Sequence, residues 1–189
     1  MPKLGMEPIR REALVLATIT EIGEQGTLDV TVSQIAKRAG VSSGLAHHYF
    51  GGKDQIFTAA MRHILKEYAR AVGMAMKSKI GPRDRVEAII RASFSEEQFD
   101  PVLVSAWTNF YVASQTSKDA KRLLRIYQSR LLSNLAYELR PLLGHKATHC
   151  AQGIAAMIDG LYIRRALGDD GIDPAHLVLA YLNAQLGTH

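Results

Sequence analysis

Cysteine is nearly absent from this sequence of 189 residues, because Cys150 is its only thiol. One thiol cannot build a disulfide framework, so the sequence favours a reducing compartment. Uninterrupted apolar runs of about 18 residues, long enough to cross a bilayer, are also missing. The N-terminal stretch MPKLGMEPIRRE contains no apolar segment of the secretory-signal type. We therefore expect a cytoplasmic protein.

Sequence signatures of several enzyme classes are missing as well. The chain contains no HExxH zinc motif, no Glu-x-x-His pair and no dinucleotide-binding glycine set. His145 and His149 stand one helical turn apart beside Cys150, a spacing that suits a metal pair, but no further ligand is obvious nearby. The sequence favours surface histidines there, and we expect no catalytic activity, no metal and no cofactor.

Acidic residues are missing from one stretch, Val30 through Gly52, although the whole chain holds 18 of them. The formal net charge is +5 and the pI is about 9.4, values that invite a nucleic-acid partner. The basic excess is modest, and the first 60 residues carry equal numbers of acidic and basic side chains. Overall charge is therefore weak support for DNA binding, and the acid-free stretch is more informative.

Helical periodicity dominates the chain, and no alternating strand pattern is evident. Capping residues, glycines and prolines divide the sequence into about nine helices, which predicts an all-α fold. The first helices are short and the later ones long, which indicates a small head, residues 8–68, on a larger body, residues 69–189. The expected helices are one that Pro8 opens and Gly23 and Gly26 close, then 31–39, 42–50, 53–80, 83–94, one after Pro101, 118–140 ended by Pro141, 146–167, and 173–186 followed by Gly187.

Two short helices of the head have the spacing of a helix–turn–helix. Thr31 and Gln34 form a capping box, and a turn of Gly40 to Ser42 precedes a second helix that runs to Phe50. The outward face of this second helix is small and polar, which suits entry into a DNA major groove. That face carries Ser43, Gly44, Leu45, His47 and His48.

Three other interpretations compete for the stretch VSSGLAHHYFGGKD, residues 41–54. Adjacent histidines point about 100° apart on a helix, so His47 and His48 cannot easily share a metal ion. Gly52-Lys53 lacks the spacing and the following Ser or Thr of a phosphate-binding P-loop. A solvated helix in a generic bundle is the remaining alternative, and periodicity alone leaves it open.

The head resembles the helix–turn–helix domain of TetR-type repressors, through TVSQIAKRAGVSSG, then HYF, then GKDQIF. The resemblance covers residues 8–68 and implies that the motif 31–50 binds DNA. His47 stands where family members often have tyrosine. Thr31 and Lys53 would hold phosphates at helix N-termini. The implied DNA-binding set is Thr31, Gln34, Ser42, Ser43, Gly44, Leu45, His47, His48, Tyr49 and Lys53.

The body resembles the choline-responsive branch of that family, which controls glycine-betaine synthesis genes, in SAWTNFY, RLLSNL and AAMIDGLYIRRAL. The resemblance implies a ligand-responsive repressor that binds a near-palindromic operator as a homodimer. Its effector would be a choline-like quaternary ammonium, which aromatic faces and a carboxylate can hold. The candidate effector-binding residues are Trp107, Tyr111, Asp159 and Tyr162, with Glu97 and Tyr127 as weaker candidates.

Simpler interpretations of these residues stay open. Trp107 and Tyr111 have a spacing typical of core packing, and Asp159 could pair with Arg130, Arg164 or Arg165. A repressor of another pathway or efflux gene, or a helical ligand-binding protein or enzyme, is the alternative function. The last two helices are expected to face a second copy of the chain through Ile154, Ile158, Leu161, Tyr162, Leu177, Ala180, Tyr181 and Ala184.

Overall fold

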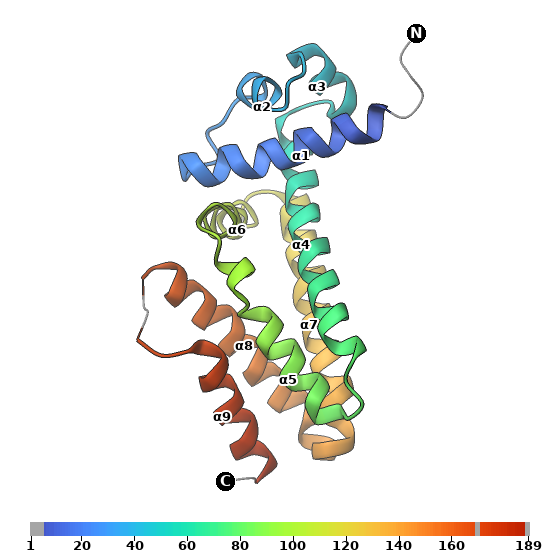
Figure 1. The fold of residues 1–189 in the computed structure, drawn as a ribbon, viewed down its shortest axis with the longest axis vertical. Coiled ribbons are helices and arrows are strands. Elements are labelled where there is room, and N and C mark those ends of the chain that lie inside the picture. The colour runs from blue at the N-terminus through green and yellow to red at the C-terminus, as the bar shows by residue number, and fades with distance from the viewer. Residues whose placement is uncertain (1–5, 169–170, 188–189) are drawn as a thin grey trace. The chain divides into compact units, whose positions relative to one another are not determined.

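A computed structural model describes residues 6–168 and 171–187, and over these ranges the chain forms helices and no β-strand. The predicted all-α fold is confirmed. None of the described helices is both long and apolar enough to cross a membrane. The helices of these ranges (Figure 1) are α1 (Met6–Gln25), α2 (Val32–Arg38), α3 (Ser43–Phe50), α4 (Lys53–Lys77), α5 (Pro82–Ser93), η1 (Glu96–Phe99), α6 (Pro101–Ala113), α7 (Lys118–Leu143), η2 (Gly144–Lys146), α8 (Ala147–Ala166) and α9 (Pro174–Leu186).

The helices group into two compact units. The first contains residues 1–66 and 100–123, and the second contains residues 67–99 and 124–189. The long helices α4 and α7 therefore contribute a part to each unit. The sequence predicts a head that ends at residue 68, and the structure adds that α6 and the start of α7 pack with the N-terminal helices.

In the first unit, α1, α2 and α3 gather around the start of α4, and α6 packs against α1 (Figure 1). Gly23 was expected to close the first helix, but it lies inside α1, which ends only at Gln25. A Cβ on Gly23 would collide with Val102 of α6, so this glycine allows a close helix contact instead. The interior of the unit is mostly apolar and includes Leu14, Ile22, Ile35, Ala46, Ile56 and Phe110.

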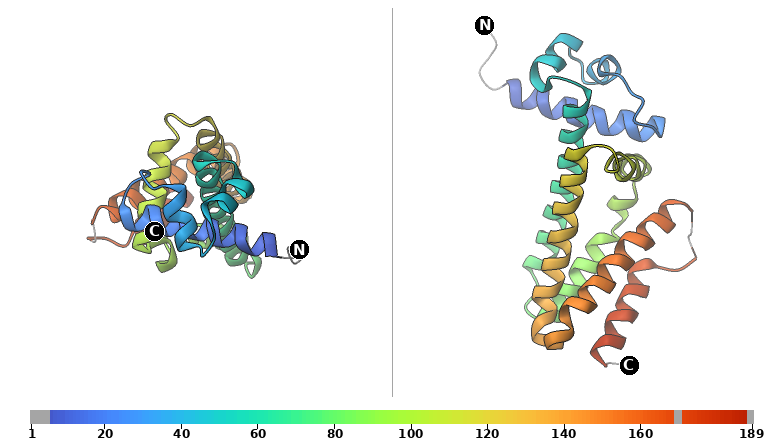
Figure 2. Two further views of the ribbon diagram at one scale, coloured as in Figure 1. Left: turned by 90° about the horizontal axis from the view of Figure 1, so that it is seen from above. Right: turned by 180° about the vertical axis from the view of Figure 1, so that it is seen from behind.

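The second unit surrounds one apolar cluster with α5, α8, α9 and the later parts of α4 and α7. α8 and α9 lie side by side and run in opposite directions (Figure 2). They approach closely because Gly153 of α8 has no side chain to obstruct Tyr181 of α9. The cluster includes Val86, Ile89, Ile90, Leu135, Leu139, Ile154, Ile158, Val178 and Leu182.

Two predictions about the second unit are wrong. α7 continues through Pro141 to Leu143, because the fixed φ of proline is helical and only one hydrogen bond is lost near the helix end. Ile154 and Ile158 do not face a second copy, since both are buried in the core of their own chain. The exposed positions of α8 and α9 include Ala156, Gly160, Ala180 and Ala184.

Candidate DNA-binding and effector sites

Capping interactions shape the helix–turn–helix of the first unit. The Thr31 side chain accepts the N–H of Gln34 at 3.2 Å, and the Gln34 side chain accepts the N–H of Thr31 at 2.8 Å, which confirms the predicted capping box. The N–H of Val41 bonds the Ala36 carbonyl at 3.0 Å and ends α2 in a Schellman motif. Gly40 has a φ of 68° in this turn, a conformation that favours glycine.

The second helix of the motif, α3, turns a small polar surface outward. Its N-cap is Ser42, whose side chain accepts the N–H of Leu45 at 3.2 Å. Ala46 is fully buried beneath it. The exposed positions of α3 match the outward face expected from the sequence and are Gly44, His47 and His48, while Ser43 and Leu45 at its margin are half-buried.

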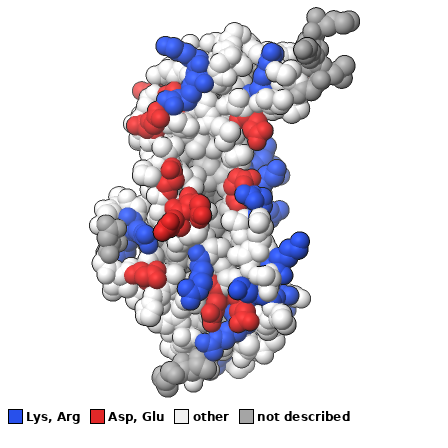
Figure 3. Space-filling model, viewed as in Figure 1, with Lys and Arg blue, Asp and Glu red and all other residues white. Residues whose placement is uncertain are grey.

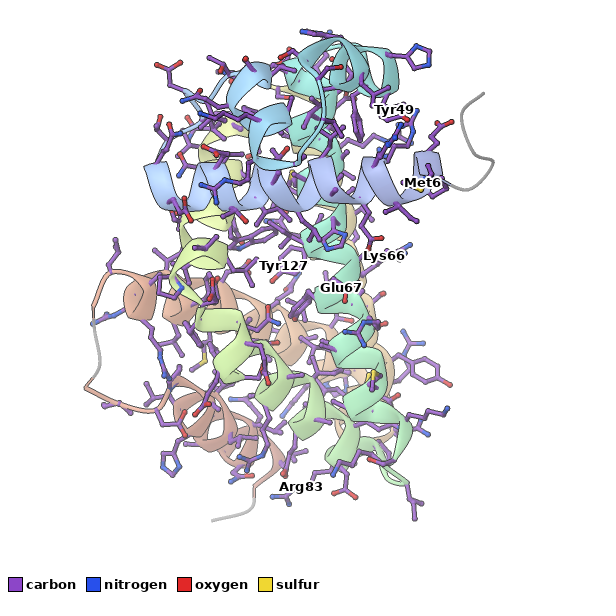
Figure 4. The ribbon with its side chains drawn as sticks, turned by 45° about the horizontal axis from the view of Figure 1, so that its top comes forward. Met6, Tyr49, Lys66, Glu67, Arg83 and Tyr127 are labelled. Carbon is purple, nitrogen blue, oxygen red and sulfur yellow. The ribbon has the colours of Figure 1, made fainter. Side chains whose placement is uncertain are left out.

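Arg11 of α1 contacts the aromatic pair at the end of α3. Its guanidinium carbon lies 5.4 Å from the ring centre of Tyr49 and 5.1 Å from that of Phe50. Its Nε also donates to the Glu7 carboxylate at 2.8 Å. Tyr49, labelled in Figure 4, is half-buried. Arg11 thus links the orientation of α3 to α1.

A cluster of charges joins α2 to α1. Arg38 donates from Nε to Glu21 at 2.5 Å and from Nη1 to Glu24 at 3.3 Å, and Gln25 donates to Glu21 at 2.8 Å. The hydrogen bonds to Glu21 and Glu24 raise the pKa of Arg38 above its ordinary value. A basic side chain of the motif is therefore engaged in positioning α2, and its charge is already matched within the protein.

Lys53 begins α4, and its side chain is 40% exposed. Its Nζ lies 4.0 Å from Oδ1 of Asp29 and 5.3 Å from the ring centre of Phe57. Asp29 is almost fully exposed, and such surface ion pairs contribute little to stability. The ammonium group can therefore exchange this carboxylate for a DNA phosphate at small cost.

Charges of both signs are interspersed over the face of the molecule in Figure 3, without one large basic field. The first 60 residues have no net charge by formal count. Overall charge is therefore weak support for a nucleic-acid partner, and the geometry of the helix–turn–helix is the more informative feature.

Around Asp159, hydrogen bonds and ring contacts link four helices of the second unit. The Tyr127 hydroxyl of α7 donates to Oδ1 of Asp159 on α8 at 3.0 Å. The Tyr127 ring packs edge-on against Tyr68 of α4, with centres 5.5 Å apart. The Tyr68 hydroxyl lies 2.8 Å from Oγ of Ser93 on α5. Burial is the main cause that raises the pKa of Tyr68 to about 12.

Tyr162 lies on α8 one turn after Asp159. Its hydroxyl donates to the backbone carbonyl of Gln98 at 3.0 Å, and burial raises its pKa. Its ring stacks on Phe99, with centres 5.1 Å apart and planes at 28°. The Arg165 guanidinium lies over Phe99, 4.4 Å from the ring centre. Sequence reasoning did not select Phe99 or name this role for Arg165, because their partners are far apart in the chain.

The remaining effector candidates lie on η1 and α6. Glu97 is exposed in η1, and a hydrogen bond with Ser95 lowers its pKa. Trp107 and Tyr111 belong to α6 in the first unit, where their rings meet edge-on with centres 5.2 Å apart. Trp107 is buried there, as the core-packing interpretation expects.

Known proteins match both parts of the chain. Residues 14–60 match the model for bacterial regulatory proteins of the tetR family, and residues 82–187 match the C-terminal domain of BetI-type transcriptional repressors. The chain is a BetI-type repressor of the TetR family. It is 53% identical to the HTH-type transcriptional regulator BetI of Brucella abortus, over 98% of this chain and 96% of that protein. The corresponding regulator of Rhizobium meliloti is 50% identical, over 98% and 94%.

Solved structures share the fold of this BetI-type repressor. A transcriptional regulator from Pseudomonas aeruginosa PAO1 superposes with a TM-score of 0.86 at 27% identity, over 98% of this chain and 93% of that one. A transcriptional regulator from Saccharomonospora viridis, solved in complex with choline, has a TM-score of 0.79 at 20% identity, over 92% and 93%. The relatives are transcriptional regulators, so the chain belongs to a family of regulators and not of enzymes.

Proposed function

We propose that this repressor acts in the cytoplasm as a homodimer on a near-palindromic operator, controls choline-to-glycine-betaine genes, and is induced by choline. The observation that carries the proposal is the 53% identity to a BetI regulator, because it extends over 98% of the chain and so includes both units. The choline complex of the S. viridis protein, which has the same fold, adds support.

The proposed DNA contact uses α3 for base edges and Lys53 for a phosphate. Support comes from the exposed, acid-free surface of α3 and from the weakly held ammonium group at the start of α4. A phosphate contact adds affinity for every DNA sequence and makes binding depend on salt. The other candidate DNA-binding residues, Thr31, Gln34, Ser42 and Tyr49, would support this surface from its margins.

Replacing Lys53 tests the phosphate contact. K53A is expected to weaken binding to operator and to unrelated DNA alike, and to flatten the slope of log affinity against log salt by about 0.9. Fluorescence anisotropy over a range of salt concentrations measures both quantities. K77A, which removes the same charge at the far end of α4, is the matched control. An unchanged slope in K53A would exclude a phosphate contact by Lys53.

The proposed effector site is built from aromatic rings and one carboxylate. A quaternary ammonium cannot donate a hydrogen bond, so its recognition depends on ring faces and on negative charge, each cation–π contact contributing about 0.5–2 kcal/mol. Tyr127, Asp159 and Tyr162 supply these groups in the second unit. Trp107 and Tyr111, main candidates from the sequence, become secondary ones because they belong to the first unit, and the exposed Glu97 stays a weaker candidate.

Calorimetry with choline tests the effector. We expect saturable heat with choline and much weaker binding of 3,3-dimethylbutan-1-ol, which has nearly the same shape without the charge. D159N is expected to weaken choline binding, because it removes the carboxylate but keeps a polar group for Tyr127. If the protein binds its operator but gives no heat with millimolar choline, the alternative is favoured. The chain would then be a repressor of another pathway that responds to a different molecule.

The proposed homodimer would use α8 and α9. Their exposed positions include the small residues Ala156, Gly160, Ala180 and Ala184, which allow helices to approach closely. A two-fold axis through such a surface would pair both helices with their copies, and would match the symmetry of a near-palindromic operator. This surface replaces the buried Ile154 and Ile158 in the expected interface.

A further inference from the structure

A cation already occupies an aromatic face in the second unit. Arg165, in the last turn of α8, places its guanidinium carbon 4.4 Å from the ring centre of Phe99. That distance is well within the range of about 6 Å in which a cation is attracted to a ring. Both Arg165 and Phe99 are half-buried, so the contact is partly shielded from water.

The Phe99 ring is also stacked with other aromatic residues. Tyr162 lies 5.1 Å away, with planes at 28°, and Phe94 lies 6.5 Å away, with planes at 5°. Tyr162 is held in place by its hydrogen bond to the Gln98 carbonyl, which belongs to the same short helix as Phe99. Phe99 is therefore a fixed ring, stacked on a proposed effector residue, with a protein cation lying over it.

We propose that Phe99 is a further effector-binding residue and that Arg165 is a built-in competitor, whose guanidinium must leave the ring before a quaternary ammonium can bind there. The proposal rests on the proposed function, since it takes the effector to be such a cation. A guanidinium and a quaternary ammonium are attracted by the same negative ring face, and one face accommodates one cation at a time.

A tethered competitor has a consequence for the response. Because Arg165 is attached to the same unit, it competes at a high and constant effective concentration. Effector affinity is lowered by the strength of the Arg165–Phe99 contact, so the repressor answers at a higher effector concentration. Loss of the competing cation should therefore make the protein more sensitive to the effector. Removal of any positive charge close to the site would also favour a cationic effector, so a charge control is needed.

Two neighbouring arginines separate competition from general charge. R165Q and R164Q each remove one positive charge from the last turn of α8, and R165Q removes the guanidinium that lies over Phe99. Calorimetry of the full-length protein with choline, and with tetramethylammonium, is expected to show binding about two- to five-fold tighter in R165Q, the change that corresponds to a partly exposed cation–π contact. R164Q is expected to give a clearly smaller gain than R165Q, because it changes the local charge but leaves the contact with Phe99 in place.

Replacement of the ring completes the test. F99L is expected to weaken choline binding, and R165Q is expected to give no further gain in the F99L background, since the two substitutions act on one contact. Circular dichroism and thermal unfolding establish that each variant is folded. Any of three results would overturn the competitor: R165Q binds choline no more tightly than the wild type, R165Q and R164Q gain equal choline affinity, or R165Q gives its full gain in the F99L background.

The two proposals fail in different ways. If the wild-type protein binds choline but R165Q does not bind it more tightly, the competitor is refuted and the choline-responsive function stands. If neither protein binds choline or tetramethylammonium, the effector class is wrong and the competitor is overturned with it. If R165Q binds choline and the wild-type protein shows no binding, the competitor is supported. The wild-type protein would then respond only at choline concentrations above those used.

Discussion

Gly44 lies in the first turn of α3 on its exposed side, and a Cβ there would meet nothing within 4 Å. Glycine in a helix costs about 0.5–1 kcal/mol relative to alanine. The fold of the free protein does not require glycine at position 44. The close approach of a binding partner is therefore the better explanation for Gly44. We expect G44A to stabilise the free protein by up to about 1 kcal/mol and to weaken operator binding, because a methyl group would separate the α3 backbone from the DNA.

Urea unfolding and anisotropy with labelled operator measure the two effects of G44A. The matched control is G73A, because Gly73 of α4 is also exposed and a Cβ there would also meet nothing within 4 Å. G73A is expected to stabilise the protein without a change in operator affinity. Unchanged operator binding by G44A would show that α3 does not approach DNA at this position.

At the scale of the element, side-chain contacts link four helices of the second unit. The residues that make these contacts are Tyr68, Ser93, Tyr127 and Asp159. The pKa of Tyr68 is raised to about 12 from an ordinary 10, mainly by burial. Between these two values the unfolded chain releases the phenol proton, whereas the folded chain retains it. The stability from this group is thus complete below pH 10 and is lost as the pH rises toward 12, by up to about 1.4 kcal/mol per pH unit.

The pH dependence can be assigned to Tyr68 by comparison with Y68F. At pH 8 this variant is expected to be less stable by about 1 kcal/mol, because Ser93 loses a hydrogen-bond partner. Above pH 10 its free energy of unfolding should fall less steeply than that of the wild type, since one phenol with a raised pKa is gone. Urea unfolding followed by circular dichroism from pH 8 to 11.5 gives both curves, and parallel curves would contradict the assignment.

Element boundaries were predictable wherever local signals decide them. The capping box of Thr31 and Gln34 and the turn at Gly40 need only neighbouring residues, and the structure has both. Gly23 and Pro141 have local patterns that usually end helices, yet both lie within helices. Gly23 serves a contact with α6, and Pro141 lies in a last turn, so tertiary packing and position in the helix outweigh the residue type there.

At the scale of the whole molecule, the effector candidates were only partly predictable. Resemblance and residue type selected Tyr127, Asp159 and Tyr162, but no local pattern reveals that Tyr127 donates to Asp159 or that Arg165 lies over Phe99. Two residues of the expected dimer face, Ile154 and Ile158, were wrong for a related reason. Periodicity identifies apolar faces, but only the assembled fold shows that Ile154 and Ile158 are enclosed by their own chain while smaller residues stay exposed.

Ala180 offers a direct test of the assembly, because it is exposed on α9 and so tolerates a change in the single chain. A two-fold interface contains each position twice, so A180E would introduce two buried like charges, which cost several kcal/mol without partners. We expect A180E to be monomeric by size-exclusion chromatography with light scattering. Operator affinity should fall about 100-fold or more, since two half-sites are no longer bound by one linked dimer.

Control variants distinguish lost assembly from lost folding. S133E introduces the same charge at an exposed position of α7 and is expected to remain dimeric with normal operator affinity. The A180E monomer should keep the helical circular-dichroism signal, because Ala180 is not part of the apolar core of its own chain. A folded A180E protein that still forms dimers would exclude this part of α9 from the interface, and the operator would then be bound through a different pairing of the two chains.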